Sequence, residues 1–303
     1  MFAYCSLVMV QTWLLLALLS PALYAIANVI DKFAVSKRVQ NCFAYLTMIS
    51  AAWFLAALAT FIFVPWNDVT ISQILLGIVA GLSYSGGYYV YFYSLTFEEA
   101  SRVVSLIFLS PIIVVGFAAL FLGELLPIWK YGAILLAVVG AILIGLEKIE
   151  IKPMMRKGFW LMMVSCFFWA TTNVINKYMI ESLSFWNMFG LQALGLSLGL
   201  SFSLLSKDAR KHLSMAFKCW HFILVSEGLN FAGVLIFLYA LTLTDLSLVS
   251  PIGAVQPLYL LFLTIFISIF KPQILKEVIN RETLVLKVVS VLMIVVGTFL
   301  VAM

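Results

Sequence analysis

Residues 28–32 read NVIDK and residues 173–177 read NVINK, and each phrase closes an apolar segment of similar length. Further along, residues 93–111 read YSLTFEEASRVVSLIFLSP and residues 239–257 read YALTLTDLSLVSPIGAVQP. The first pair is separated by 145 residues and the second by 146, a difference that a single extra residue explains. Polar phrases that recur at a nearly constant offset indicate that the chain contains two copies of one unit.

The composition is that of a membrane protein. Of the 303 residues, 64% are hydrophobic and 10% are charged, and the mean hydropathy is +1.14, whereas a soluble domain carries roughly 25% charged residues. A helix needs about 20 apolar residues to cross the roughly 30 Å of bilayer hydrocarbon. The runs lack the alternation of a transmembrane β-barrel strand. We therefore expect an all-α membrane protein with ten transmembrane helices, at approximately 11–30, 42–64, 73–94, 102–122, 128–146, 158–179, 186–205, 220–243, 247–269 and 284–303.

Several other classes of segment are not supported. The first apolar segment lacks a basic region before it and has a counterpart in mid-chain, so we interpret it as a retained helix rather than a signal peptide. The four cysteines have neither disulfide nor metal-ligand spacing. The polar stretches are too short to form a soluble domain, and the sequence has no GxxxxGK[ST] motif. We therefore expect no metal, no cofactor and no nucleic-acid partner.

The repeat divides the chain into a first five-helix unit at 1–146, a basic linker loop at 147–157 and a second five-helix unit at 158–303. Because five is an odd number, the second unit must enter the membrane from the opposite face. Inverted repeats of this kind are typical of secondary transporters, in which the related halves enclose a site near the midplane that opens to either side.

The basic residues support this helix count. Sixteen of the 18 lysines and arginines lie in or beside the odd-numbered loops, and only Lys130 and Lys177 lie on the other side. If one helix had been missed or wrongly added, every later loop would change sides and the asymmetry would be lost. By the positive-inside rule the odd loops are cytoplasmic and both termini are external, in a protein that we expect in the cell (inner) membrane.

The order of these features resembles the drug/metabolite transporter superfamily, specifically its EamA-like ten-helix members. Each half has an Asn/Lys-ended first helix, an aromatic third helix ending in YSLT or YALT, an acidic turn (EEAS or TDLS) and a fourth helix with a proline. The first half has FLGE before its fifth helix, whereas the second half reads SIFKPQILKEVINRE there, with Glu277 or Glu282 as a loose substitute. The resemblance implies transport of small metabolites. It also implies cytoplasmic termini, the reverse of the charge count.

Glu227 is the first candidate for the substrate site. It lies seven residues into the eighth segment, roughly 10 Å deep at 1.5 Å per residue, and Asn230 follows one turn later on the same face. An ionisable group at that depth costs about 2.5 to 3.5 kcal/mol on insertion scales. It is either a proton carrier, an ionised anchor for a cationic substrate, or an acid hydrogen-bonded to a neighbouring helix for packing alone.

Asn28 and Asn173 occupy equivalent positions near the ends of their segments, each followed one turn later by Asp31 or Asn176 and then by a lysine. These amides either cap and bridge helices or line the central cavity, and we favour the cavity. For Lys32 and Lys177 we favour anchoring at opposite interfaces.

The third segment contains YSGGYYVYFYSL, in which Tyr84 and Tyr88 share one helical face. These rings, together with Trp169 from FFWATTNV, are candidates for stacking or cation–π contacts with a substrate, although buried aromatics more often only pack. Gln256 precedes Pro257, where a bend frees backbone carbonyls and creates either a gating element or static curvature.

The predicted function is a secondary transporter, an exporter or exchanger of small metabolites such as amino acids, amines or drugs, working by alternating access with protons as a possible coupling ion. The protein is expected to be a monomer or a homodimer. The alternatives are a membrane-embedded enzyme and a non-transporting structural or receptor-like membrane protein. No paired-carboxylate or HExxH motif supports an enzyme, and neither alternative requires an inverted duplication.

Overall fold

A computed structural model describes the backbone of the chain at residues 2–34, 39, 41–67, 69–94, 106–144, 157–270 and 281–303, and the side chains over slightly shorter ranges. The regular structure of these residues is helical throughout and includes no strand. Apart from Lys157, the predicted linker at 147–157 lies outside the described residues. The elements are α1 (Phe2–Ala34), α2 (Cys42–Phe63), α3 (Ile71–Ser94), α5 (Ser110–Phe117), η2 (Ala118–Leu122), α6 (Ile128–Ile144), α7 (Lys157–Ile180), α8 (Phe185–Ser201), η4 (Phe202–Leu205), α9 (Lys207–Lys218), α10 (Trp220–Leu243), α11 (Leu246–Ile252), η5 (Gly253–Val255), α12 (Gln256–Phe270) and α13 (Arg281–Ala302).

Eight stretches within the described ranges are helical, long and apolar enough to cross a membrane. They are Thr12–Asp31, Cys42–Phe63, Ile71–Ser94, Lys157–Ile180, Phe185–Leu205, Trp220–Leu243, Leu246–Ile267 and Val285–Ala302. The fourth and fifth predicted segments contain the shorter apolar helices Ser110–Leu122 and Ile128–Leu143, and both segments extend into residues outside the described part. The expectation of an all-α, multi-pass membrane protein is confirmed, whereas the count of ten crossings stays a prediction.

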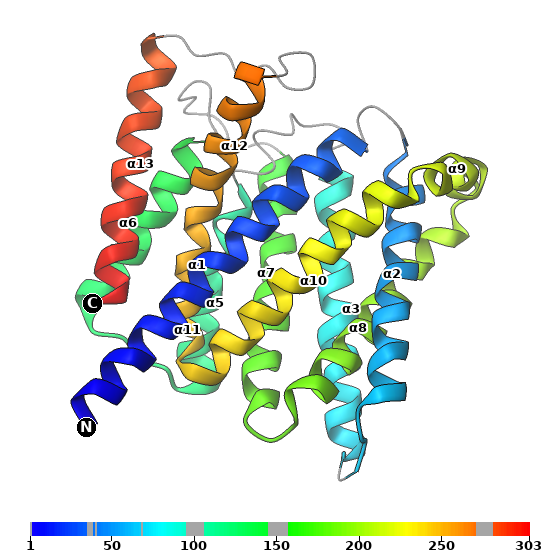
Figure 1. Cartoon of the computed structure of the whole chain (residues 1–303), viewed down its shortest axis with the longest axis horizontal. Coiled ribbons are helices and arrows are strands. Elements are labelled where there is room, and N and C mark those ends of the chain that lie inside the picture. The colour runs from blue at the N-terminus through cyan, green and yellow to red at the C-terminus, as the bar shows by residue number, and fades with distance from the viewer. Residues whose placement is uncertain are drawn as a thin grey trace.

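The long helices pack in pairs that each take one member from either half of the chain. In Figure 1, α1 starts at the lower end of the bundle and α7 starts at the upper end, so equivalent first helices run in opposite directions. The main contacts join α1 with α10, α3 with α7, α2 with α8, and α6 with α13.

Two hydrogen bonds show that this pairing follows the sequence repeat. The Ser20 hydroxyl on α1 donates to the Gly233 carbonyl on α10 over 2.9 Å, and the Ser165 hydroxyl on α7 donates to the Gly87 carbonyl on α3 over 2.8 Å. Ser165 follows Ser20 by 145 residues and Gly233 follows Gly87 by 146, the offsets of the repeated phrases. The two halves therefore make the same contact with the roles of their first and third helices exchanged.

Helices α3 and α8 approach closely because glycines face each other between them. A Cβ atom on Gly81 would lie 2.7 Å from the Gly195 carbonyl carbon, and one on Gly77 would lie 3.1 Å from Leu191 Cδ1. The absence of side chains at these places lets the two backbones touch, as in other packed membrane helices. These glycines therefore bring α3 and α8 together inside the bundle.

Both halves also contain a helix that is interrupted near a proline. The ninth segment divides into α11, the 3₁₀ turn η5 and α12, with Pro251 in the first piece and Pro257 in the second. In the fourth segment, α5 begins at Ser110 with Pro111 in its first turn. Pro111 and Pro257 are equivalent in the repeat, so the predicted bends occur as breaks at matching positions.

Helix α9 was not expected from the hydropathy pattern, in which residues 206–218 are a polar stretch. The Ser206 hydroxyl caps it by accepting a hydrogen bond from the Ala209 backbone N–H over 3.4 Å. Ala209 and Ala216 are buried against the bundle, which explains how so polar a segment remains helical.

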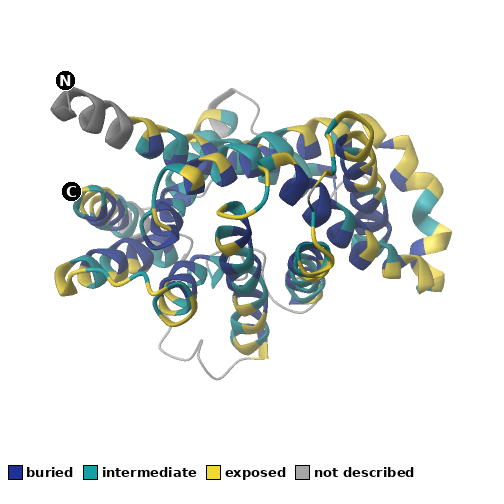
Figure 2. Cartoon of the chain, turned by 90° about the horizontal axis from the view of Figure 1, so that it is seen from below, coloured by how far each residue is buried: buried dark blue, intermediate teal, exposed yellow. Residues whose placement is uncertain are grey.

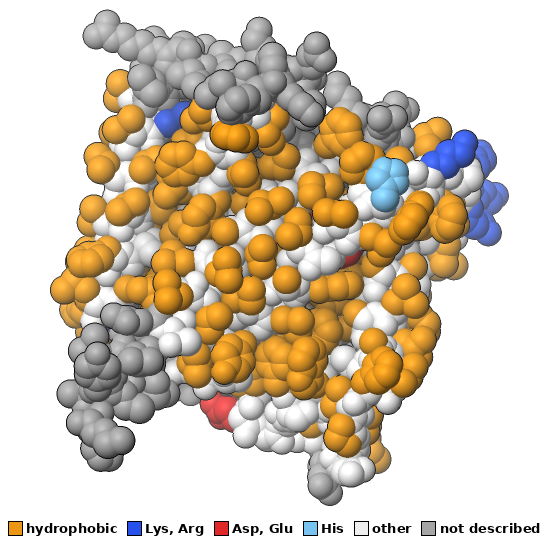
Figure 3. Space-filling model, viewed as in Figure 1, with side chains coloured by type: hydrophobic (Ala, Val, Ile, Leu, Met, Phe, Trp, Pro, Cys, Tyr) orange, Lys and Arg blue, Asp and Glu red, His pale blue; other side chains and the backbone are white. Residues whose placement is uncertain are grey.

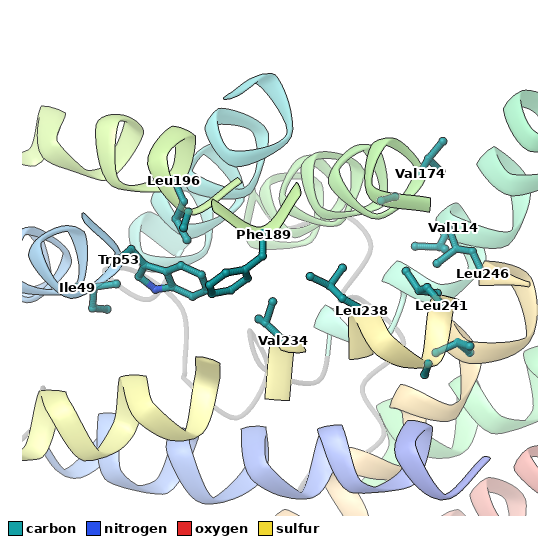
Figure 4. Packing of buried hydrophobic residues seen from close by; sticks show 14 of the residues in the cluster. Ile49, Trp53, Val114, Val174, Phe189, Leu196, Val234, Leu238, Leu241 and Leu246 are labelled. Carbon is teal, nitrogen blue, oxygen red and sulfur yellow. The ribbon is translucent and has the colours of Figure 1, made fainter. Parts of the chain in front are cut away.

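One large hydrophobic cluster extends through most of the bundle, and a smaller one lies around Phe108, Ala137, Ala141, Ala254, Val255 and Ile294. Figure 4 shows Trp53 of α2 beside Phe189 of α8 in the larger cluster, with ring centroids 6.0 Å apart. Trp53 also makes an edge-on contact with Phe231 of α10, at 4.5 Å. The indole is therefore positioned on both of its sides by rings from the second half of the chain.

Candidate functional site

The Glu227 carboxylate is buried in the first third of α10, with only 1% of the residue exposed. One of its oxygens accepts a hydrogen bond from Trp53 Nε1 over 2.8 Å, and the other accepts from Asn230 Nδ2 over 3.1 Å. The expected pairing of Glu227 with Asn230 along one helical face is thus confirmed. The bond to Trp53 connects α10 to α2, so Glu227 also joins the two halves.

A second carboxylate, Asp31 near the end of α1, lies in the same region. Its Oδ1 accepts hydrogen bonds from the hydroxyls of Tyr45 on α2 and Ser226 on α10. Asp31 and Glu227 are close enough for their charges to interact. Three helices that are distant in sequence therefore bring two acids and their donors together between α1, α2 and α10.

The two acids have no basic partner within the described part of the chain. All hydrogen bonds to these carboxylates come from Trp53, Asn230, Tyr45 and Ser226, which are neutral. The side chain of Lys32, next to Asp31, is not among those described. Glu227 is buried and Asp31 is half-buried. Two acids at such a place, with neutral donors among the described side chains, favour the binding of a proton or a cation, because a second negative charge in a low-dielectric site is costly.

Aromatic rings of α3 and α7 border the same region. The Tyr84 and Tyr88 rings lie 5.3 Å apart, and the Trp169 ring lies 6.4 Å from Tyr84, 6.3 Å from Tyr88 and 6.2 Å from Tyr91. Tyr84 and Tyr88 both lie within electrostatic range of Glu227. The predicted rings therefore form one aromatic group beside the acids.

Trp169 has a polar atom that this packing leaves unused. Its indole Nε1 is buried and has no hydrogen-bond partner among the described residues. A Cβ atom on Gly87 would lie 2.7 Å from the Trp169 ring, so the absence of a side chain at Gly87 is what admits the indole against α3. A buried indole N–H usually has an acceptor, so this donor is an exception among the described residues.

Three of the predicted site residues are not joined to this cluster by any hydrogen bond that the described residues make. Asn28 on α1, Asn173 on α7 and Gln256 at the start of α12 are each half-buried. Their role in lining a cavity stays a prediction. Asn176, one turn after Asn173, is instead buried and donates to Gln192 Oε1 on α8 over 3.1 Å.

Lys177 and Lys130, which lie on the predicted side of the membrane with few basic residues, both bind carbonyls at the carboxyl end of another helix. The Lys177 ammonium donates to the carbonyls of Leu241 and Thr244, each over 3.0 Å, at the carboxyl end of α10. The Lys130 ammonium donates to the Val301 carbonyl over 3.0 Å at the end of α13. A cation at a helix carboxyl terminus is stabilised by unpaired carbonyls and the helix dipole. Both lysines therefore have a structural role, Lys177 within the second half and Lys130 between the halves, and for Lys177 this is more specific than the interfacial anchoring expected.

From sequence, Asp31, Tyr45, Trp53 and Ser226 were not recognised as members of the site. Asp31 directly follows the first predicted crossing and lies one turn after Asn28, and an acid at this place was a usable signal for the site. For Tyr45, Trp53 and Ser226 no such signal exists, since these residue types are common in membrane helices and their partners lie 14 to 195 residues away.

Two further features lie apart from the acids. An open hollow of about 250 Å³ lies between α2 and α8 and contains none of the eight predicted site residues; it is lined by Thr47, Ser50, Ala51, Phe54, Ser197, Leu198, Ser201 and Leu204. The described residues contain no group of three or more His, Cys, Asp or Glu side chains suited to a metal ion.

Comparison with known proteins gives the broad class. None of the curated proteins matches the sequence. A solved structure titled only "Crystal structure of protein" superposes with a TM-score of 0.67 at 12% identity, over 96% of this chain and 97% of that chain, which shows a shared fold. The sequence model of the EamA-like transporter family matches residues 11–146 and again residues 156–303, which are the two halves of the repeat. The chain therefore belongs to the EamA-like transporter family, a family of membrane transporters of small molecules.

Proposed function

We propose that this protein is a secondary transporter of small cationic or zwitterionic metabolites, such as amines, amino acids or drugs, and that the Asp31–Glu227 region binds the substrate or its coupling proton. The observation that carries this proposal is the pair of acids between α1, α2 and α10, whose donors among the described side chains are neutral. A positively charged group is the ligand that such a site favours.

The aromatic group supports the substrate class. The rings of Tyr84, Tyr88 and Trp169 lie beside the acids and provide π faces. A desolvated cation–π contact contributes about 2 kcal/mol. An amine or an amino acid places a cation near the carboxylates and an apolar or aromatic part near the rings.

Alternating access between inverted repeats is the proposed mechanism. Its support is that equivalent helices pair across the halves with exchanged roles, and that the broken helices lie at matching positions beside Pro111 and Pro257. Broken helices in corresponding positions are the usual pointer to a transporter's binding region. Transport is driven by a proton gradient, by exchange, or by the gradient of the substrate itself, in the direction of export or exchange.

An enzymatic function is disfavoured by membership of a transporter family. A structural or receptor-like role has no feature in its favour among the described residues.

The proposal is tested by transport into proteoliposomes. A panel of labelled amines, amino acids and cationic drugs is assayed with and without an inward proton gradient, for the parent protein and for Glu227→Gln. Glutamine keeps the size of the side chain and one acceptor oxygen, removes the charge, and replaces the other acceptor with a donor. We expect flux of at least one cationic or zwitterionic compound, and a loss of about tenfold or more in the variant, the equivalent of roughly 1.4 kcal/mol.

The matched control is Glu181→Gln, because Glu181 is an exposed acid in the turn between α7 and α8. Its transport should equal that of the parent. Unchanged flux and unchanged dependence on the proton gradient in Glu227→Gln would remove Glu227 from the mechanism. No flux of any compound by well-folded parent protein would contradict the transporter proposal itself.

A further inference from the structure

Helix α9 lies across the transmembrane helices rather than along them. Figure 1 shows it nearly end-on at the upper right of the bundle, and Figure 2, turned by 90°, shows it from the side at the right-hand end of the molecule. It follows η4 after one residue and precedes α10 after one residue. Because its two ends are joined to membrane-spanning segments, α9 is held at the level where those segments leave the hydrocarbon.

The surface of α9 is divided into two faces. Ala209 and Ala216 are 1% and 0% exposed and pack against the bundle. On the opposite side, Lys207, Lys211 and Lys218 fall within a sector of about 40°, at 3.6 residues per turn. Together with Arg210 these residues form the basic face of α9, and all four are exposed.

The basic face is nearly free of opposing charge. Asp208 is the acidic residue of α9, and it lies in the first turn, where an acid favours the helix itself. Figure 3 shows the corresponding blue atoms gathered at the outer upper edge of the molecule. The described residues between α2 and α3, which occupy the matching place in the first half, contain no Lys or Arg.

Large apolar side chains flank the basic face. Phe217 is 64% exposed and Trp220 is 51% exposed, and Phe202, Leu205 and Met215 are also exposed. Aromatic and aliphatic side chains next to a row of cations are typical of a helix that lies in the membrane interface, with its apolar part in the acyl region and its cations at the headgroups.

We propose that the basic face of α9 binds the headgroups of anionic phospholipids in the leaflet on that side of the membrane. Charge complementarity identifies this partner, since four cations at headgroup depth attract phosphate groups that carry net negative charge. The flanking apolar side chains make a lipid a better fit than a soluble anion, because only a lipid also covers Phe217 and Trp220. The proposal does not depend on the identity of the transported substrate.

The test uses the full-length protein in bilayers that contain a spin-labelled lipid, either phosphatidylglycerol or phosphatidylcholine. The fraction of each label that the protein immobilises gives its preference for the anionic lipid. The test variant replaces the four basic residues together, Lys207→Gln, Arg210→Gln, Lys211→Gln and Lys218→Gln. The matched control is Lys207→Arg with Lys211→Arg and Lys218→Arg, which keeps the charge.

We expect the parent and the arginine variant to prefer phosphatidylglycerol, and the glutamine variant to lose at least about threefold of that preference, given the strength of single basic residues at a charged surface. High salt should reduce the preference of the parent, because the contact is electrostatic. If the glutamine variant does not fold, Lys207→Gln with Lys211→Gln is measured instead, with a smaller loss expected. An unchanged preference in the glutamine variants, or displacement of the lipid by inorganic phosphate at constant ionic strength, would overturn the proposal.

Discussion

The contact between α3 and α8 and the contact between α10 and α2 occupy matching places in the two halves, but they are built differently. In the first, Gly81 brings the backbone of α3 against Gly195 of α8. In the second, Glu227, which follows Gly81 by the repeat offset of 146 residues, reaches Trp53 of α2 through a side-chain hydrogen bond. One contact is backbone packing, and the other is a side-chain hydrogen bond to a carboxylate.

The same difference separates Asp31 from its counterpart Asn176, 145 residues later. Asp31 accepts hydrogen bonds from Tyr45 and Ser226, whereas Asn176 donates to Gln192. Both acids thus lie on the α1–α2–α10 side, and their equivalents on the α7–α8–α3 side are an amide and a glycine. The repeat keeps the equivalent contacts of Ser20 and Ser165, while the two carboxylates lie on one side. In the function that we propose, the duplication provides the scaffold and that side carries the chemistry.

The largest expected effect is the loss of stability that follows when a side chain is introduced at Gly81. In Gly81→Leu, the new side chain meets the backbone of α8, which has no room to move, so we expect a loss of about 3 kcal/mol or more in stability, at the upper end of overpacking costs. The yield of monodisperse protein and its thermal unfolding in detergent measure this. Gly228→Leu is the control, because a Cβ atom on Gly228 has no neighbour within 4 Å. Equal stability of the two variants would show that the α3–α8 backbone contact is unimportant.

A second expected effect is on transport rather than folding. Asp31→Asn makes the α1 site chemically like Asn176, while the new amide oxygen still accepts from Tyr45 and Ser226. We expect the fold to be retained and the transport of a cationic substrate to fall about tenfold or more, because the site loses its charge. Flux in proteoliposomes measures this, with the exposed Asp245→Asn as control. If Asp31→Asn transports as the parent does, the charge asymmetry between the two sides has no role in transport.

Sequence reasoning predicted the segments well because hydropathy and the repeat are local signals. The predicted eighth segment, 220–243, coincides with Trp220–Leu243, and the Glu227–Asn230 pair follows from spacing on one helix. The repeat offset identifies which residues are equivalent, but it does not say which helices pack together. The Trp53–Glu227 bond, between residues 174 apart, required the three-dimensional structure for that reason.

Helix α9 shows a second limit of prediction from the sequence, which concerns short helices that are not apolar. A scan for apolar runs of about 20 residues passes over a 12-residue amphipathic helix. Its pattern of buried alanines and capping Ser206 is visible in the sequence, yet the same residues suit a polar loop. Only the packing of Ala209 and Ala216 against the bundle distinguishes the two.

The smallest expected effect tests the similarity of the halves rather than their difference. Ser20→Ala and Ser165→Ala remove the two equivalent hydrogen bonds to Gly233 and Gly87, whose lengths differ by 0.1 Å. Such bonds between membrane helices contribute about 0.6 kcal/mol on average. Both serines are buried, at 1% and 0% exposure. Removal of either hydroxyl leaves one backbone carbonyl with only its hydrogen bond inside the helix. We therefore expect the two variants to lose the same small amount of stability, within about 0.5 kcal/mol of each other. Thermal unfolding of the two variants and of the double variant measures this. A large loss from one serine only would mean that the charged side and its neutral counterpart differ in packing as well as in chemistry.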